Sequence, residues 1–353
     1  MHVHAKDMNP RPLVVRFGAL GDMVILTTAI RHLHARFAQP VDIVASGDWT
    51  RPLLQDQPGV GDIFLIGSRK WPYWLSPDQL RLVRALRTRG AGPTWLFDHD
   101  NRKICRLLER AGWSPPYWCH HEDLSGLEGS HFCDRWLRFA YRNPSVLGGN
   151  DLQPIANDAY GELAVTARHR DEVDAWMKSR GLADRSLILI QVGNKRTMRR
   201  GLRQRGTNSK YWPEENWAAV LRGLRVLHAD AAILLLGVPQ ESALNESILQ
   251  LAGISKAYNV VHELSIPRLI GLAARAMGMV SVDTGPAHLA AAVGCTVVTL
   301  FGKAEPSLYA PRGSTAVVKC LVGEGPDERS MRLIAPTQVL AAWEEVMRGQ
   351  DRL

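Results

Sequence analysis

The sequence has few cysteines and no long apolar run, and these absences exclude several classes of protein. Its five cysteines are scattered through 353 residues, and no two are spaced as Cys-x-x-Cys. An odd number of dispersed cysteines is typical of a reducing compartment. The longest apolar runs, such as Ala231 to Leu236, fall far short of the ~20 residues that a membrane-spanning helix needs. The N-terminus also lacks the apolar segment of a secretory signal, so we expect a cytoplasmic protein.

Several well-known binding motifs are also missing. Neither the three-glycine dinucleotide fingerprint nor the Gly-Lys-Ser/Thr of a P-loop follows Gly18 and Gly21, which argues against a nicotinamide-dependent oxidoreductase. No zinc-finger, RNP or helix-turn-helix signature accompanies the net charge of +8, so nucleic acid is not expected as a partner. Potential zinc ligands do not form two tight pairs, and we expect no metal and no cofactor. These ligands are Cys119, His120, His121, His131 and Cys133.

The order of apolar strands and helical segments indicates an α/β fold with parallel sheets covered on both faces. The chain is long enough for two domains, and the Pro-, Gly- and Asn-rich stretch 143–162 is the best linker. We therefore expect an N-terminal domain at 1–160 and a C-terminal domain at 161–353, whose last helix can pack back on the first domain. Strands are predicted at 13–17, 41–45, 63–66, 95–97, 187–192, 231–236, 259–261, 278–282 and 296–301, and helices from Asp22 onward and at 51–57, 76–89, 171–179, 214–227, 241–252, 267–276, 285–293 and 336–348.

The stretch from Asp283 to His288 is the most informative in the chain. It joins an apolar strand to a helix through Asp-Thr-Gly-Pro, so that backbone N–H groups and the positive end of the helix dipole point outward. Gly285 lets a phosphate approach the backbone, and His288 can reach the same anion. Asp283 can accept hydrogen bonds from sugar hydroxyls. An ordinary strand–helix turn with a capping Asp or Thr is the alternative interpretation.

A similar turn follows the first strand of the chain. Gly18 and Gly21 keep this turn tight and free of side chains, and Asp22 opens the next helix. Asp22 can serve as a helix N-cap without any further function, or it can face a ligand.

Two further stretches in the second half can bind a nucleotide. The segment from Gly193 to Lys210 follows a strand and contains seven basic residues that can clamp a diphosphate, or form a solvated basic loop. Glu241 begins the helix after another buried strand, where a carboxylate can accept both hydroxyls of a ribose or cap the helix.

Basic and aromatic residues in the first half are candidates for contact with a ligand. Asp98 to Lys103 lies at the end of a strand, and its Arg102 and Lys103 can line a site there. The stretch Arg69-Lys70-Trp71-Pro72-Tyr73-Trp74 can touch a lipid headgroup or a sugar, or form a half-buried loop.

The ordered set of motifs resembles the ADP-heptose:lipopolysaccharide heptosyltransferase family (glycosyltransferase family 9). The resemblance spans residues 13 to about 310 and rests on GALGD at 18–22, KYWP at 210–213, GVPQE at 237–241, and DTGPAH at 283–288 followed by Phe301-Gly302. It implies the GT-B architecture, in which two Rossmann-like domains face each other across the active site. It also implies a metal-independent, inverting glycosyltransferase with an ADP-heptose-like donor. The implied acceptor is an anionic glycolipid of the lipopolysaccharide core at the inner face of the membrane.

The resemblance also implies roles for individual residues. Asp22 would be the base, and the acceptor side would include Gly18, Gly21, Arg102 and Lys103. The donor would be held by Gly193, Lys210, Glu241, Asp283, Thr284, Gly285 and His288, with Lys210 and the Thr284–Gly285 backbone on the diphosphate. The segment between Gly193 and Lys210 is longer and more basic than the family pattern. Two other functions stay open: transfer of a different nucleotide sugar by the same fold, and sugar-nucleotide binding without catalysis.

Overall fold

The computed structural model describes residues 9–67, 72–121, 129–148, 159–194, 209–325 and 330–350. The chain divides into two compact units, Met1–Tyr160 (unit 1) and Gly161–Leu353 (unit 2). Three of the proposed headgroup contacts, Arg69, Lys70 and Trp71, lie outside the described residues, as do the six basic residues between Lys195 and Arg205.

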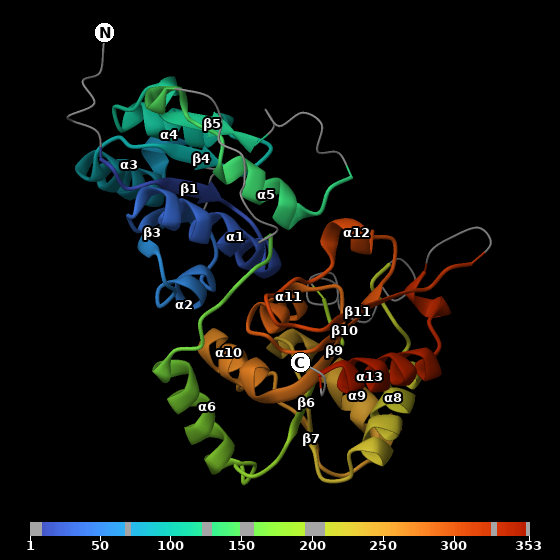
Figure 1. The fold of residues 1–353 in the computed structure, drawn as a ribbon. Coiled ribbons are helices and arrows are strands. Elements are labelled where there is room, and N and C mark those ends of the chain that lie inside the picture. Colours follow the sequence, from blue (N-terminus) through green and yellow to red (C-terminus); the bar gives the residue numbers. More distant parts are fainter. Residues whose placement is uncertain are drawn as a thin grey trace. The chain divides into compact units, whose positions relative to one another are not determined.

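Unit 1 is built around a five-stranded parallel sheet with the order β3-β2-β1-β4-β5. Helices α1 and α5 pack together, as do α3 and α4, and Figure 1 shows the two pairs on opposite faces of the sheet. The strands are β1 (Leu13–Arg16), β2 (Val41–Ala45), β3 (Val60–Leu65), β4 (Thr94–Leu96) and β5 (Trp118–His120). The helices are α1 (Leu20–Phe37), α2 (Thr50–Leu54), α3 (Pro77–Arg89), α4 (Arg102–Arg110) and α5 (Phe132–Ala140), with 3-10 turns η2 (Tyr73–Leu75), η3 (Pro115–Tyr117) and η5 (Ser145–Leu147).

Unit 2 has a six-stranded parallel sheet with the order β11-β10-β9-β6-β7-β8. Helices α6, α10 and α11 cover one face, and α8, α9 and α13 cover the other (Figure 1). The strands are β6 (Leu187–Gln191), β7 (Ala232–Leu235), β8 (Ala257–Asn259), β9 (Ala276–Val282), β10 (Val297–Phe301) and β11 (Val318–Val322). The helices are α6 (Ala167–Ser179), α8 (Glu214–Leu227), α9 (Ser242–Ala252), α10 (Ile266–Arg275), α11 (Gly285–Ala292), α12 (Pro306–Tyr309) and α13 (Pro336–Gln350), with 3-10 turns η7 (Pro239–Glu241) and η8 (Met331–Leu333).

The core of unit 2 anchors one of the sequence motifs. Trp212 of the Lys-Tyr-Trp-Pro stretch is 1% exposed and meets Trp217 edge to face, with ring centroids 4.9 Å apart. Its indole Nε1 donates a hydrogen bond to the Ile334 carbonyl at 3.0 Å. A buried indole with its N–H satisfied fixes the chain firmly, so the neighbouring Lys210 starts from a rigid attachment point.

The α/β fold and most of its strands agree with the sequence prediction, but some elements differ. β8 begins two residues earlier than predicted, and α6 begins four residues earlier. The short strand β5, the edge strand β11 and the helices α4 and α5 were not predicted. α13 packs within unit 2, against α8, β10 and β11.

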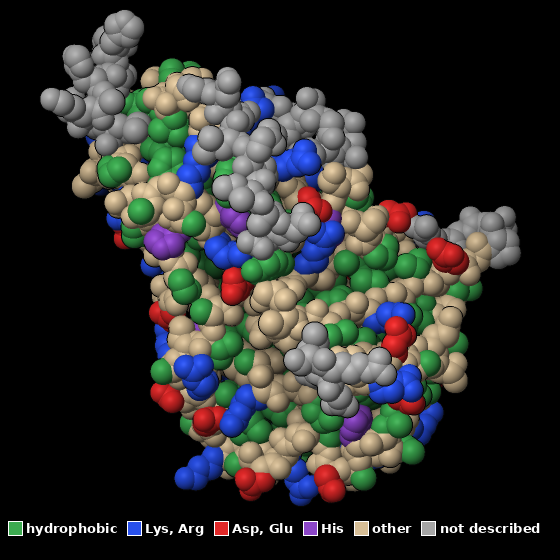
Figure 2. All heavy atoms as spheres, in the orientation of Figure 1, with side chains coloured by type: hydrophobic (Ala, Val, Ile, Leu, Met, Phe, Trp, Pro, Cys, Tyr) green, Lys and Arg blue, Asp and Glu red, His purple; other side chains and the backbone are tan. Residues whose placement is uncertain are grey.

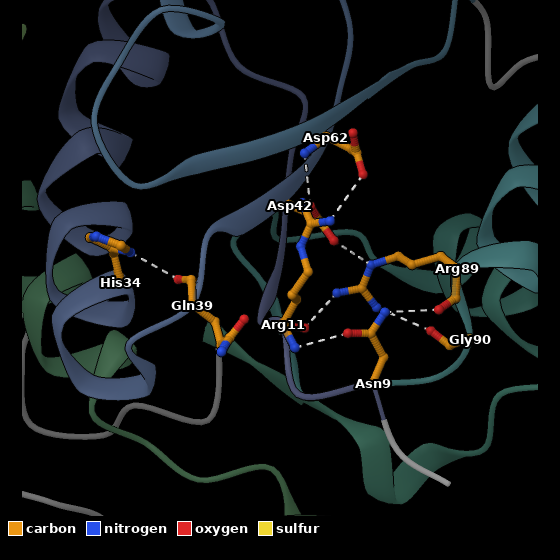
Figure 3. A network of polar contacts seen from close by, with 8 residues as sticks. All are labelled: Asn9, Arg11, His34, Gln39, Asp42, Asp62, Arg89 and Gly90. Atoms are coloured by element: carbon orange, nitrogen blue, oxygen red, sulfur yellow. Dashed lines mark hydrogen bonds and ion pairs between the residues drawn. The ribbon is translucent and has the colours of Figure 1, made fainter.

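A buried ionic network ties together the amino ends of the unit 1 strands (Figure 3). Asp42 is fully buried and forms ion pairs with Arg11 and with Arg89, whose Nε lies 2.6 Å from Oδ2. The backbone N–H of Asp62 donates to Asp42 Oδ1 at 2.8 Å. The side-chain amide of Asn9 donates to the Arg89 carbonyl at 2.8 Å. The network joins the segment before β1 to β2, β3 and the end of α3.

Replacing Asp42 by asparagine is expected to destabilise the protein by about 3 kcal/mol, because it leaves two arginines without their buried counter-charge. The free energy of unfolding in denaturant measures the effect. Asp62→Asn is the matched control, since the Asp62 carboxylate is 66% exposed and its ion pair with Arg11 is longer, at 3.2 Å. Equal stabilities of the two variants would contradict a structural role for the network.

Candidate functional site

Asp22 lies just after β1, at the carboxyl edge of the unit 1 sheet. It is the third residue of α1 and not its N-cap, which is Ala19; the expected N-cap role is therefore wrong in detail. Asp22 Oδ2 accepts a hydrogen bond from the Ala19 N–H at 2.7 Å and so stabilises the helix start. A Cβ on Gly18 would lie 2.3 Å from the Asp22 Cβ, so this close turn requires glycine. Gly21 is the second residue of α1 and is buried.

Arg16 joins Asp22 to a second carboxylate, that of Asp98. Arg16 Nη2 donates to Asp22 Oδ1 at 2.7 Å, and Nη1 donates to Asp98 Oδ1 at 3.0 Å. The guanidinium also lies over the Trp136 ring, 5.0 Å from its centroid, and its side chain is only 14% exposed. Asp98 Oδ2 accepts the Phe17 N–H at 3.1 Å. The Asp22 carboxylate, itself 36% exposed, is thus held from two sides and remains open to solvent.

The other predicted acceptor-side residues begin α4, directly beyond the Asp98 segment. Arg102 and Lys103 are both exposed. The Arg102 guanidinium bonds the Asp100 carboxylate, with Nε to Oδ1 at 3.0 Å. Because this pair is almost fully in water, it contributes little to stability and leaves Arg102 able to exchange partners.

Glu241 lies in η7, beyond the carboxyl ends of β6 and β7. The side chain is 3% exposed, and Oε2 accepts the Val238 N–H at 3.1 Å. A Cβ on Gly193 would lie 2.0 Å from Glu241 Oε1, and one on Gly237 would lie 2.5 Å from Oε2. Gly237 also has a φ of +144°, which other residues avoid. Two bare backbone segments therefore cradle this carboxylate.

Burial raises the pKa of Glu241 to about 7, against the opposing hydrogen bonds from Val238 and Gln191. A buried carboxyl group is costly to ionise. Such a group favours a ligand that donates hydrogen bonds to it, and two neighbouring hydroxyls would do so.

Lys210 and Asp283 meet at the carboxyl end of β9. Lys210 Nζ donates to Asp283 Oδ2 at 2.5 Å and to the Asp283 carbonyl at 2.8 Å. The carboxylate side chain is 9% exposed and that of the lysine 35%. The two residues are 73 positions apart in the sequence, and the fold brings them into direct contact.

The first turn of α11 follows directly. Its N-cap is Thr284, which makes no side-chain capping bond and instead donates from Oγ1 to the Val282 carbonyl at 3.2 Å. The expected capping interpretation of this turn therefore does not hold for Thr284. Gly285 and Pro286 start the helix, and His288 lies in the first turn with 8% exposure. Backbone N–H groups at such a start lack intrahelical partners.

Two of the scattered zinc candidates have other hydrogen-bond partners. His131 is the N-cap of α5 and its Nδ1 accepts the Cys133 N–H at 3.1 Å. Cys119 Sγ donates to the Thr94 carbonyl. Within the ranges that the structure describes, no group of three or more His, Cys, Asp or Glu side chains is arranged to hold a metal ion.

Sequence reasoning missed the residues that support the candidate site. Arg16 ends an apolar strand, and a charged side chain at the carboxyl end of such a strand could have identified it as a site residue. Gly237 was part of a quoted motif without a role. Gly302 was likewise quoted without a role. Asn194, whose side-chain amide donates to the Lys210 carbonyl, carries no local pattern that marks it.

Comparison with known proteins shows which proteins this chain resembles. Residues 166–333 match the model of glycosyltransferase family 9 (heptosyltransferase). Lipopolysaccharide heptosyltransferase 2 of Salmonella typhimurium is 23% identical over 327 residues, covering 88% of each chain.

Solved structures establish the fold independently. Escherichia coli ADP-heptose LPS heptosyltransferase II superposes with a TM-score of 0.72 at 19% identity, covering 97% of this chain and 99% of that one. E. coli heptosyltransferase WaaC, solved with ADP, gives a TM-score of 0.65 at 17% identity, covering 95% and 99%. The α/β fold with two Rossmann-like domains of the GT-B architecture is thus confirmed. Residues 166–333 thus form a glycosyltransferase family 9 (heptosyltransferase) domain, and the protein is a glycosyltransferase.

Proposed function

We propose that this enzyme transfers heptose, or a closely related sugar, from an ADP-sugar to an acceptor of the lipopolysaccharide core type. The observation that carries the proposal is the buried, glycine-cradled Glu241 on the same sheet edge as the Lys210–Asp283 pair. These three side chains match the parts of a nucleotide sugar. The Glu241 carboxylate suits a ribose, the Lys210 ammonium suits a diphosphate, and the Asp283 carboxylate suits the sugar. Relatives of this chain include heptosyltransferases, one of them solved with ADP.

Each donor residue has a distinct role in the proposal. Glu241 accepts hydrogen bonds from the ribose, with Gly193 providing the space. Lys210, His288 and the N–H groups of Thr284 and Gly285 bind the diphosphate, because a helix start and a cation both favour anions. Asp283 accepts hydrogen bonds from hydroxyls of the transferred sugar.

The proposed reaction is a single displacement with inversion at the anomeric carbon. Asp22 removes the proton from the attacking acceptor hydroxyl, and the nucleoside diphosphate leaves with the electron pair of the broken bond. Charge grows on the leaving phosphate in the transition state, so cationic and N–H donors placed there lower the barrier. Lys210 and α11 supply these donors, which is the basis for proposing that the reaction needs no divalent metal.

A panel of nucleotides in a thermal-shift assay tests the donor class. ADP and ADP-sugars should raise the melting temperature more than UDP, GDP and their sugars. A preference for UDP or GDP would remove ADP-heptose as the donor and leave the family assignment intact.

The raised pKa of Glu241 predicts pH-dependent nucleotide binding. Ribose hydroxyls donate to the ionised carboxylate, so ADP should bind about tenfold more weakly at pH 6 than at pH 8. Glu241→Ala should weaken ADP binding by about 1–3 kcal/mol, because the hydroxyls lose their buried acceptor. Isothermal titration calorimetry measures both effects. A pH-independent affinity in the parent protein would move the ribose site elsewhere.

The raised pKa of Glu241 also predicts that the free energy of unfolding falls as the pH rises, whereas ADP affinity increases. The unfolded side chain ionises near pH 4.5, but the folded one stays protonated to about pH 7. Stability is therefore lost as the pH rises through this window, by up to about 3 kcal/mol above it. Glu241→Gln should stabilise the unliganded protein at pH 8, whereas the exposed control Glu215→Gln should not.

We further propose that the enzyme works at the cytoplasmic face of the inner membrane, where a lipid-linked core acceptor is available. No described helix is long and apolar enough to cross a bilayer. Trp74 and Leu75 in η2 are 74% and 58% exposed, and they follow the basic pair Arg69 and Lys70 in the sequence. We choose η2 as the candidate contact because its apolar side chains are exposed. On the face in Figure 2, basic side chains of unit 2 are interspersed with acidic ones.

Vesicle co-sedimentation tests this contact. The parent should bind vesicles that contain phosphatidylglycerol at low salt and release them at high salt, since each well-placed Lys or Arg is worth about 1 kcal/mol. Replacing Trp74 and Leu75 by serine should weaken binding about tenfold through lost apolar burial. Serines at the exposed pair Val226 and Leu227 in unit 2 serve as the control. Equal binding by both variants would rule out η2 as the contact.

A further inference from the structure

The Lys210–Asp283 ion pair occupies the position that the proposed function gives to the donor diphosphate. The ammonium group makes two contacts with Asp283, one to Oδ2 and one to the backbone carbonyl. An ammonium has three N–H donors, and two of those of Lys210 are directed at Asp283 in the β9–α11 turn. An incoming diphosphate gains Lys210 fully only by taking it from Asp283.

Two neighbouring strands fix the backbone of Lys210. The Asn194 side-chain amide, just beyond β6, donates to the Lys210 carbonyl at 3.2 Å. A Cβ on Gly302, at the end of β10, would lie 2.1 Å from the Ser209 carbonyl oxygen, so that carbonyl rests on bare backbone. The buried Trp212 holds the other side. The lysine can therefore change partners only by rotating its own side chain.

The Asp283 carboxylate is destabilised when Lys210 leaves it. The carboxylate is 9% exposed, and a buried carboxylate without a partner is unfavourable. A phosphate group nearby adds like-charge repulsion. Hydroxyls of a transferred sugar would replace the lysine as hydrogen-bond donors, whereas a free nucleoside diphosphate brings none to this position.

From this geometry, and resting on the proposed function, we propose that Asp283 is a specificity-determining residue that discriminates a nucleotide sugar from the free nucleoside diphosphate. With a nucleotide sugar, Lys210 moves to the diphosphate and the sugar hydroxyls satisfy Asp283. Once the sugar has left, Asp283 recaptures Lys210 and weakens the hold on the product. The movement of Lys210 between Asp283 and the diphosphate thus favours binding of the donor and release of the product.

Calorimetric titration of ADP into the full-length protein tests the proposal. Asp283→Asn should bind ADP three- to tenfold more tightly than the parent, because it frees Lys210 and removes the repelling charge, and Asp283→Ser should do the same. Lys210→Met should bind ADP at least tenfold more weakly. Asp230→Asn is the matched control: it breaks the Lys256–Asp230 pair of 2.9 Å, whose carboxylate is 85% exposed, and should leave ADP affinity unchanged.

Product inhibition provides the second measurement. The ratio of the ADP inhibition constant to the donor KM should fall in Asp283→Asn, because the variant favours the product over the sugar donor. Unchanged or weaker ADP binding in both Asp283 variants, with parent-like melting temperatures, would overturn the proposal. If a different nucleoside diphosphate binds best, the same comparison is made with it. Failure of sugar transfer by the parent would instead refute the proposed function.

Discussion

Replacing Asp22 by asparagine should lower kcat about 10²- to 10⁴-fold, the usual contribution of a general base. Asparagine has nearly the same shape, and its carbonyl oxygen can still accept a hydrogen bond from Arg16 or from the Ala19 N–H. The variant loses the ability to take a proton from the acceptor hydroxyl. Donor affinity should change little, because the proposed donor residues all belong to unit 2. Steady-state transfer kinetics and ADP calorimetry separate the two effects.

The control for this variant is Asp62→Asn, which removes an exposed carboxylate of the same unit outside the candidate site. Its turnover should equal that of the parent. Arg16→Lys gives a second comparison, because a lysine keeps the charge but cannot hold Asp22 and Asp98 with a planar fork. Near-normal turnover in Asp22→Asn would show that the proton goes elsewhere.

Replacing Lys210 by methionine should lower kcat about 10²- to 10³-fold, as expected when a donor to a developing negative charge is removed. The methionine keeps the apolar length of the side chain and loses only the ammonium. The acceptor KM should change much less than kcat, because the charge on the leaving phosphate grows in the transition state. Lys256→Met, in another Lys–Asp pair of unit 2, is the control and should have parent-like kinetics.

Chelation completes the test of the leaving-group chemistry. If Lys210 and the start of α11 stabilise the departing diphosphate, activity should survive EDTA. Loss of activity in chelator that magnesium or manganese restores would contradict this mechanism. A Lys210→Met variant with normal turnover would shift attention to Arg196, Arg199 or Arg200.

The elements with strong local signals were predictable from the sequence. The apolar strands β1, β6 and β9 and the glycine-containing turns after β1 and β9 are visible because strand and turn preferences act over a few residues. β5 has only three residues, and the N-cap of α4, Asn101, makes no side-chain capping bond. Such elements are stabilised by packing rather than by local preference, so they were missed.

Contacts between distant residues were beyond the reach of sequence patterns. Arg16 meets Asp98 across 82 positions, because β1 and β4 are neighbours in the sheet. The Lys210–Asp283 pair likewise depends on the strand order of unit 2. The motifs indicated which residues have the right chemistry, but the pairing of these charges depends on topology. The exchange of partners at Asp283 could therefore be inferred only from the structure.

The most direct test of the account is sugar transfer by the purified enzyme. ADP-heptose and a lipopolysaccharide-core acceptor that lacks heptose are incubated with the protein, and the product is measured by mass spectrometry. We expect an acceptor heavier by one heptose, with release of ADP, in the parent protein and not in Asp22→Asn. An unmodified acceptor, together with transfer from a UDP- or GDP-sugar to another acceptor, would contradict it.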